Sequence, residues 1–199
     1  MINKRMSSVA EAVADVFDGA TIMVGGFGEA GSPIELIHAL IDQGAKDLTV
    51  VSNNCGSGEV GLAALLKARR VTRVICSFPR TANSTVFPEL YREGFAKLEL
   101  VPQGTLAERI RAGGAGVPAF YTPTAVGPPL GEGPESRTFD GRAYLLARGL
   151  RAAVAFIKGR AAATHAIWLH HPPARSFVPT TPTTHTDDPT QSPALAARG

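Results

Sequence analysis

Short apolar runs alternate with helical patterns over residues 1–120, and short polar turns separate them. Runs of four or so β-branched and other apolar residues are typical of buried strands, whereas apolar residues three or four positions apart are typical of helices that cover a sheet. This alternation indicates βαβ units. We therefore expect an α/β fold with an open, mainly parallel sheet and helices on both faces, in a Rossmann-like arrangement.

The predicted strands all end in polar or glycine-rich loops. They are Thr21–Val24, Leu48–Val51, Arg73–Cys76, Leu98–Val101 and Val117–Tyr121. The first strand enters a glycine-rich loop at residues 25–33, and the second is followed by residues 52–54, Ser-Asn-Asn. Residues 77–80 follow the third strand and residues 102–104 follow the fourth.

Capping signals predict where three helices begin. Ser8 and Glu11 have the spacing of a capping box, as do Thr105 and Glu108. In residues 32–35, Ser-Pro-Ile-Glu, the serine is the predicted N-cap and the proline the first helical residue. The first helix is predicted to end at residues 18–19, the second at Gly44 and the third at residues 113–114.

Composition changes along the C-terminal third of the chain. Glycine and proline dominate residues 122–135, which predicts a loop, and a segment of mixed character follows at residues 142–158. Residues 172–199 hold six prolines and six threonines with few apolar groups, so they cannot bury enough surface to offset the entropy of ordering. We predict one main domain at residues 1–171 and a divergent or disordered tail at residues 172–199.

Overall composition indicates the size of the core and the cellular location of the protein, but it says little about the reaction. A chain of 199 residues with 44% hydrophobic content can bury one sizeable core. Its 20 basic and 17 acidic residues nearly balance, which does not indicate a nucleic-acid partner. Two cysteines, no signal peptide and no apolar run near the roughly 20 residues of a membrane span predict a soluble, cytoplasmic protein without membrane association.

The polar loops suggest one shared binding crevice. In open parallel sheets, ligands bind outside the carboxyl ends of the strands, where loops and helix N-termini converge. The loops after the first four predicted strands would line one crevice if those strands are neighbours in the sheet. The strand order itself is not encoded in this pattern.

One alternative for the glycine loop is a dinucleotide site, because residues 26–31 satisfy G-x-G-x-x-G between a strand and a helix. That fingerprint also needs an acid at the end of the second strand to bind the ribose, and residues 52–54 contain none. Moreover, Ser32-Pro33 begins the helix after the third glycine, which in the fingerprint packs within the helix. A dinucleotide-binding oxidoreductase domain is therefore the weaker hypothesis.

Longer motifs resemble one family of enzymes. Residues 18–33, DGATIMVGGFGEAGSP, resemble the signature of the A (alpha) subunit of family I CoA-transferases, which act on 3-oxo acids. Residues 52–54, 102–116 and 120–124 match further motifs in the same order. The resemblance is continuous to about residue 158 and then thins. Within the family, residues 76–80 are most similar to enzymes that use 3-oxoadipate, and acetoacetate or another 3-oxo acid is the alternative.

The resemblance implies a transferase that moves CoA from succinyl-CoA to a 3-oxo acid through a glutamyl-CoA intermediate. The nucleophilic glutamate belongs to a B subunit, so this chain is expected to be catalytic only in a hetero-oligomer, with an A2B2 heterotetramer as the implied form. No metal and no permanently bound cofactor are implied, because the CoA thioester is a substrate. A third hypothesis is that the divergent C-terminus makes this chain a non-catalytic or unstable relic, which would not assemble with a B subunit.

The candidate site residues follow from matching motif positions. Asn53 and Gln103 are candidates for oxyanion stabilisation and substrate orientation, with loop bracing as the alternative. The candidate substrate-binding residues are Gly25, Gly26, Phe27, Gly28, Gly31, Ser77 and Arg80. Bare glycine backbone lets N–H groups approach a ligand, although tight turns also need glycine. Arg80 could bind the distal carboxylate of a dicarboxylic 3-oxo acid, or be a surface residue.

Two other groups of residues suggest chemistry at first sight. Glu29 is the one carboxylate in the glycine loop, and we interpret it as a solvated residue or a helix N-terminal charge, not as the nucleophile. His165, His170 and His171 lack a carboxylate or cysteine partner in a defined scaffold, so no metal site is predicted there.

Overall fold

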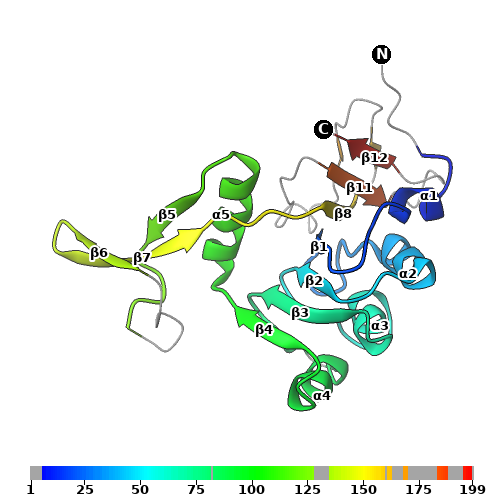
Figure 1. Cartoon of the computed structure of the whole chain (residues 1–199), viewed down its shortest axis with the longest axis horizontal. Helices are drawn as coiled ribbons and strands as arrows, with labels where there is room; N and C mark the ends of the chain where they lie inside the picture. Colours follow the sequence, from blue (N-terminus) through cyan, green and yellow to red (C-terminus); the bar gives the residue numbers. More distant parts are fainter. Residues whose placement is uncertain are drawn as a thin grey trace.

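The computed structural model describes residues 6–81, 83–127 and 135–159, together with the backbone of four short strands further along the chain. Figure 1 shows two parts: a twisted sheet with helices packed against it, called the body here, and a smaller sheet that projects from it. The smaller sheet consists of β5 (Ala119–Thr122), β6 (Ser136–Phe139) and β7 (Arg142–Arg148) and is called the arm. Within the described ranges, no helix combines the length and apolar character that crossing a membrane requires.

The body contains a seven-stranded sheet in the order β12-β11-β8-β1-β2-β3-β4. Its strands are β1 (Thr21–Val24), β2 (Leu48–Val51), β3 (Val71–Cys76), β4 (Lys97–Leu100), β8 (Val154–Lys158), β11 (Thr183–Asp187) and β12 (Leu195–Arg198). Every pair is parallel except β11 with β12. The predicted open, mainly parallel sheet is therefore confirmed, and the first four predicted strands are indeed neighbours.

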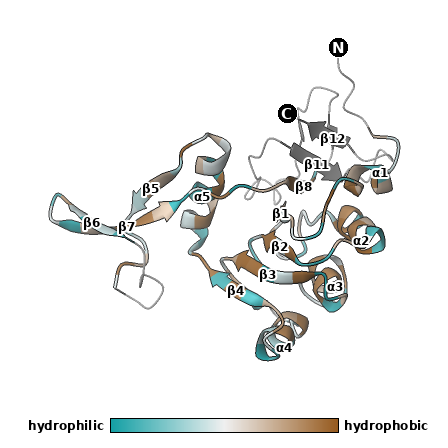
Figure 2. Ribbon diagram, viewed as in Figure 1, coloured by the Kyte–Doolittle hydropathy of each residue, from teal (hydrophilic) through white to brown (hydrophobic). Residues whose placement is uncertain are grey.

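Alternate side chains of the strands point into two separate cores. Ile22 and Val24 belong to a large cluster with the helices of one face, whereas Met23 and Ile75 pack with Leu106 of the other. The helices are α1 (Val9–Val13), α2 (Ile34–Gln43), α3 (Gly61–Lys67), α4 (Val86–Arg92) and α5 (Gln103–Gly114). Because α5 supplies the second cluster, helices cover both faces, as predicted. Figure 2 shows β3, α2 and α3 as largely hydrophobic, whereas β4 at the sheet edge contains both hydrophobic and hydrophilic residues.

The predicted cap of the first helix is confirmed, although the helix itself is shorter than predicted. The Glu11 backbone N–H donates to Ser8 Oγ at 3.1 Å, which satisfies one of the first free amides of α1. The helix ends at Val13, whereas the apolar spacing predicted a helix up to residue 18.

The two other predicted helix starts are wrong, by one residue for α2 and by three residues for α5. Pro33 is the N-cap of α2, and Ser32 is not, because the Ser32 carbonyl already accepts the Ile34 N–H in a turn (3.0 Å). Helix α5 begins at Gln103, with the Leu106 N–H donating to the Pro102 carbonyl at 2.8 Å. Thr105 therefore lies inside the first turn and does not form a capping box. In both cases a proline, whose fixed φ suits a helix start, sets the boundary.

The arm follows α5 in the chain, and the segment that leads out of the arm packs against α5 again. The predicted fifth strand corresponds to β5, which begins two residues later and ends one residue later than predicted. The mixed segment at residues 142–158 contains β7 of the arm and β8 of the body. The chain returns to the body through Gly149 and Leu150, which pack against the C-terminal end of α5. A Cβ atom on Gly113 would lie 1.7 Å from the Leu150 carbonyl oxygen, so only glycine fits there.

The C-terminal segment contains short strands. Within residues 172–199, β11 pairs in parallel with β8 of the main sheet, and β12 pairs with β11. The prediction of a divergent or disordered tail at residues 172–199 stays a prediction, and the rest of that segment lies outside the described residues. The strands β9 (Ala161–Ala162) and β10 (Trp168–Leu169) form a separate two-stranded sheet.

Candidate active site

A cavity of about 390 Å³ opens at the carboxyl ends of the body strands. Because β1, β2, β3 and β4 are neighbours, the loops that follow them converge there, as the parallel arrangement requires. The cavity is lined by Phe27, Gly28, Asn53, Asn54, Ser77, Phe78, Thr81 and Gln103. The structure thus brings together one candidate from each of the four loops.

The glycine loop forms a tight turn that presents Phe27 to the cavity. Phe27 and Ala30 exchange backbone hydrogen bonds of 2.9 and 3.2 Å, and the Phe27 side chain is 54% exposed. Gly26 has φ +119°, and a Cβ there would lie 3.1 Å from the Ser32 nitrogen. The Gly25 N–H donates to the Phe156 carbonyl in the sheet at 2.9 Å. The conformation of Gly26 and the hydrogen bond of Gly25 show that both residues build the turn.

Asn53 forms the floor of the cavity and is only 3% exposed. Its side-chain oxygen Oδ1 accepts hydrogen bonds from Ser77 Oγ and from Gln103 Nε2, each at 2.7 Å. Its backbone carbonyl accepts the N–H groups of Ser77 (3.2 Å) and Phe78 (3.0 Å). One buried residue after β2 therefore ties together the ends of β2 and β3 and the start of α5. Since both lone pairs of Oδ1 are occupied, the carboxamide NH2 is the group of Asn53 that remains available to a ligand.

The rim of the cavity combines apolar and polar side chains. Phe78 is 58% exposed and lines the same cavity as Phe27, so two large apolar rings border a polar floor. Thr81 Oγ1 lies 2.6 Å from Ser57 Oγ, and the Ser57 N–H donates to Glu29 Oε1 at 3.2 Å. Glu29 links the glycine loop to the loop after β2 from outside the cavity lining, which agrees with its interpretation as a surface charge.

Four predicted residues do not line this cavity: Gly25 and Gly26, which build the turn, and Gly31 and Arg80. Gly31 lies at the end of the glycine turn, and Arg80 lies on the loop after β3. Three lining residues were not predicted: Asn54, Phe78 and Thr81. Asn54 belongs to the same motif as Asn53, and Phe78 follows Ser77 directly, so proximity in sequence could have indicated both.

Two cysteines, Cys55 and Cys76, are neighbours in sequence of the cavity-lining residues Asn54 and Ser77. The Sγ atoms of Cys55 and Cys76 are 3.8 Å apart, and both residues are buried in the larger core cluster. The hydrogen bond with Cys76, together with burial, raises the pKa of the Cys55 thiol, which keeps it protonated at neutral pH. Within the described residues no three or more His, Cys, Asp and Glu side chains are grouped as a metal site, and His165, His170 and His171 lie outside those residues.

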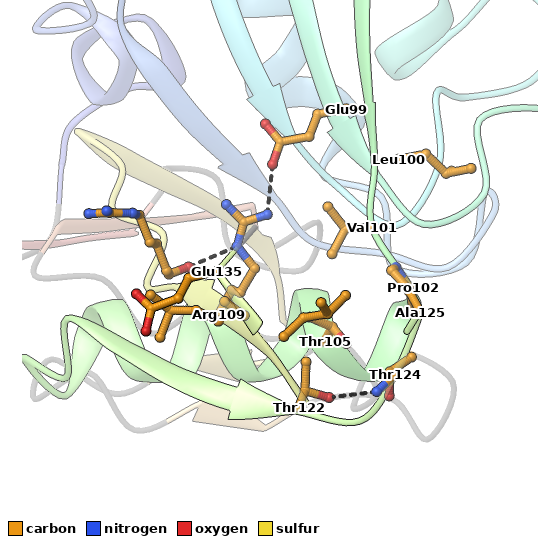
Figure 3. A pocket seen from close by; sticks show the side chains of 14 residues that line it. Glu99, Leu100, Val101, Pro102, Thr105, Arg109, Thr122, Thr124, Ala125 and Glu135 are labelled. Carbon is orange, nitrogen blue, oxygen red and sulfur yellow. Dashed lines mark hydrogen bonds and ion pairs between the residues drawn. The ribbon is translucent and has the colours of Figure 1, made fainter. Parts of the chain in front are cut away.

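A second hollow, of about 430 Å³, lies between β4, α5 and the arm, and is called the arm cleft here. Figure 3 shows Arg109 extending across it to Glu99 on β4. Arg109 donates to Glu99 Oε1 at 2.7 Å and to the Arg148 carbonyl at 2.8 Å, and Arg73 binds the other oxygen of Glu99. Burial opposes ionisation of Glu99, but the two arginines outweigh it and lower its pKa. The charges of Glu99 and Arg109 are therefore satisfied within the cleft.

Comparison with known proteins places the chain in a family. The family model for Coenzyme A transferase matches residues 6–175, and the chain belongs to this family. It is 54% identical over 179 residues to the A subunit of 3-oxoadipate CoA-transferase of Pseudomonas putida, covering 90% of this chain and 78% of that protein. The resemblance seen in the sequence motifs is thereby confirmed.

Two further comparisons extend the similarity. The A subunit of a probable succinyl-CoA:3-ketoacid coenzyme A transferase of Bacillus subtilis is 47% identical over 178 residues, covering 89% of this chain and 74% of that protein. The structure of glutaconate coenzyme A-transferase from Acidaminococcus fermentans matches with a TM-score of 0.78 at 17% sequence identity, covering 92% of this chain and 66% of that one. The first supports the family at the sequence level, and the second shows the shared fold.

Proposed function

We propose that this chain is the A component of a two-subunit CoA-transferase that moves CoA from succinyl-CoA to a 3-oxo acid, with 3-oxoadipate as the preferred acceptor. The observation that carries the proposal is the buried Asn53 carboxamide, held at the floor of a cavity by Ser77 and Gln103. The higher identity to a 3-oxoadipate enzyme, 54% against 47% for a succinyl-CoA:3-ketoacid enzyme, supports the choice of acceptor.

In this mechanism the B subunit supplies a glutamate, which receives CoA from succinyl-CoA and becomes a glutamyl-CoA thioester. The CoA then passes from this glutamate to the 3-oxo acid. A carboxylate suffices as nucleophile because the acyl group arrives already activated as a thioester. Each transfer places negative charge on an acyl oxygen, and the Asn53 NH2 group offers donors for it inside a cavity bordered by Phe27 and Phe78. Gln103, which is exposed at the start of α5, is the second amide that a bound acid could reach.

The proposed assembly is an A2B2 heterotetramer in the cytoplasm, with the cavity facing the B subunit. Both sequence relatives are named as the A component of their enzyme, which supports a partner chain. The dinucleotide hypothesis loses support from the structure: α2 begins at Ile34, beyond the third glycine, and the uncharged Asn53 follows β2.

The experiment is an assay of the purified chain, alone and mixed with the B subunit that partners the Pseudomonas putida relative. Succinyl-CoA is the donor, and 3-oxoadipate and acetoacetate are compared as acceptors. We expect no transfer by the chain alone and transfer by the mixture, with a larger kcat/KM for 3-oxoadipate. Transfer by the isolated chain would refute the half-enzyme claim. A stable complex without transfer would refute the function, and failure to form a complex would favour the non-catalytic relic.

A further inference from the structure

Ser77 makes several hydrogen-bonding contacts with Asn53, which lies beside it in the cavity. Its Oγ lies 2.7 Å from Asn53 Oδ1 and 3.1 Å from the Asn53 backbone carbonyl oxygen. The Ser77 N–H also donates to that carbonyl, at 3.2 Å. The hydroxyl is partly buried and directed at Asn53 from the end of β3, so it contacts both the side chain and the backbone of the asparagine.

The carboxamide of asparagine needs such a contact to present one particular face. Its terminal torsion has a broad, roughly two-fold preference, so rotation by about 180° exchanges the oxygen and the NH2 group at little intrinsic cost. A ligand oxygen requires the NH2 face, because the amide oxygen would repel it. The position of Oδ1 therefore decides whether the cavity offers a donor or an acceptor.

Ser77 and Gln103 both donate to Oδ1, but they are not equivalent. Gln103 is exposed at the N-terminus of α5, where water competes for its hydrogen bonds. Ser77 is partly buried, and its backbone is fixed by the sheet-like bonds between the ends of β2 and β3. The more permanent of the two contacts is therefore the one from Ser77.

We propose that Ser77 is a positioning residue: it holds the Asn53 carboxamide with its NH2 group toward the cavity, and it acts on the acyl substrate through Asn53 rather than by contact. This inference rests on the proposed function and replaces the expectation that Ser77 binds substrate directly. The ligand chemistry that it selects is an oxygen acceptor, either a carboxylate or the oxyanion of an acyl transfer.

A double-mutant cycle in the complex with the B subunit tests this proposal. Ser77→Ala is expected to lower kcat about tenfold while KM changes little, because misorientation of a reacting group costs rate. In an Asn53→Ala background the same Ser77→Ala change is expected to have no further effect. Ser77→Thr, which keeps the hydroxyl, is expected to restore most of the rate. Additive losses from the two alanine changes would show direct contact with substrate and overturn the proposal.

A matched control and a readout without catalysis separate this inference from the proposed function. Ser57 is a partly buried serine that bonds Thr81 instead of Asn53, so Ser57→Ala is expected to leave kcat unchanged. The side-chain NH2 resonances of Asn53, assigned by their loss in Asn53→Ala, are expected to shift in Ser77→Ala and to stay in place in Ser57→Ala. Resonances that do not move in Ser77→Ala would overturn the inference even if the transferase activity is confirmed. Absence of transfer by the unmodified complex would instead refute the function alone.

Discussion

Two hollows in the described part of the chain, the strand-end cavity of about 390 Å³ and the arm cleft of about 430 Å³, have nearly the same volume but differ in how their polar groups are arranged. In the arm cleft, Arg109 and Glu99 bind each other. At the strand ends, a buried asparagine is held by its oxygen, which leaves its NH2 group available. A buried carboxamide whose orientation is fixed by two hydrogen bonds, rather than volume, distinguishes the candidate site.

The two hollows also differ in how firmly the elements that form them are packed. The strand-end cavity is built on strands packed on both faces, so its loops are fixed by two cores. All four residues of β6 in the arm are exposed. The strands of the arm are joined by antiparallel backbone pairing and by ring contacts of Phe139 with Tyr121 (centroids 5.2 Å apart) and with Tyr144 (5.5 Å). The attachment of the arm to α5 therefore carries more of the stability of that region than the arm itself.

The largest effect is expected where the arm joins the body. Gly113→Ala would place a methyl group 1.7 Å from the Leu150 carbonyl, so the returning chain must move away from α5. We expect a loss of more than about 4 kcal/mol in the free energy of unfolding, measured with urea. Gly104 in the same helix has open space at its Cβ position, and Gly104→Ala is the matched control, expected to be neutral or stabilising. Equal stability of the two variants would contradict the close packing.

A smaller effect is expected from the ion pair in the arm cleft. Arg109→Met removes both hydrogen bonds that Arg109 makes and leaves Glu99 with Arg73 alone, at a cost of about 1–3 kcal/mol in unfolding free energy. The control is Lys67→Met, which breaks the exposed pair with Glu59 and is expected to leave the free energy of unfolding almost unchanged. If both changes cost the same, the cleft pair is an ordinary surface contact.

The smallest effect concerns the dependence of stability on pH. The pKa of Glu99 is lowered in the folded chain, so its contribution is present above its ordinary value of 4.5 and is lost as the pH falls through the lowered value. Unfolding measured from about pH 6 to about pH 3 should therefore show a steeper acid loss in the unmodified chain than in Glu99→Gln. Parallel curves would mean that the pKa of Glu99 is not lowered by folding.

The sequence predicts the parts of the fold whose pattern is local. The strands β1 to β4 follow from apolar runs, and their order in the chain with short connections brings the four loops together. Helix α4 was not predicted because Pro88 lies within it; proline is tolerated there only because the first turn has no intrahelical partner for its missing N–H. The backbone pairing of β11 was missed because the prediction counted apolar side chains.

In the candidate site, too, the sequence predicts what is local and misses what depends on how distant segments meet. Asn53, Ser77 and Gln103 were identified by matching motif positions, and each closely follows a strand, a position that the parallel sheet fixes. The direction of a longer side chain is not fixed in this way, and Arg80, four residues past β3, does not line the cavity. The hydrogen bonds that orient the Asn53 carboxamide depend on how two loops meet, which no single segment of sequence determines.

The most direct test of the account compares one variant from each hollow in the complex with the B subunit. Asn53→Asp keeps Oδ1 and replaces the NH2 group with a second oxygen, whereas Thr122→Val removes a hydroxyl that lines the arm cleft. For CoA transfer from succinyl-CoA to 3-oxoadipate, we predict that Asn53→Asp lowers kcat/KM by about 10²–10³-fold and that Thr122→Val leaves it unchanged. Undiminished transfer in Asn53→Asp, with loss of transfer in Thr122→Val, would contradict the account.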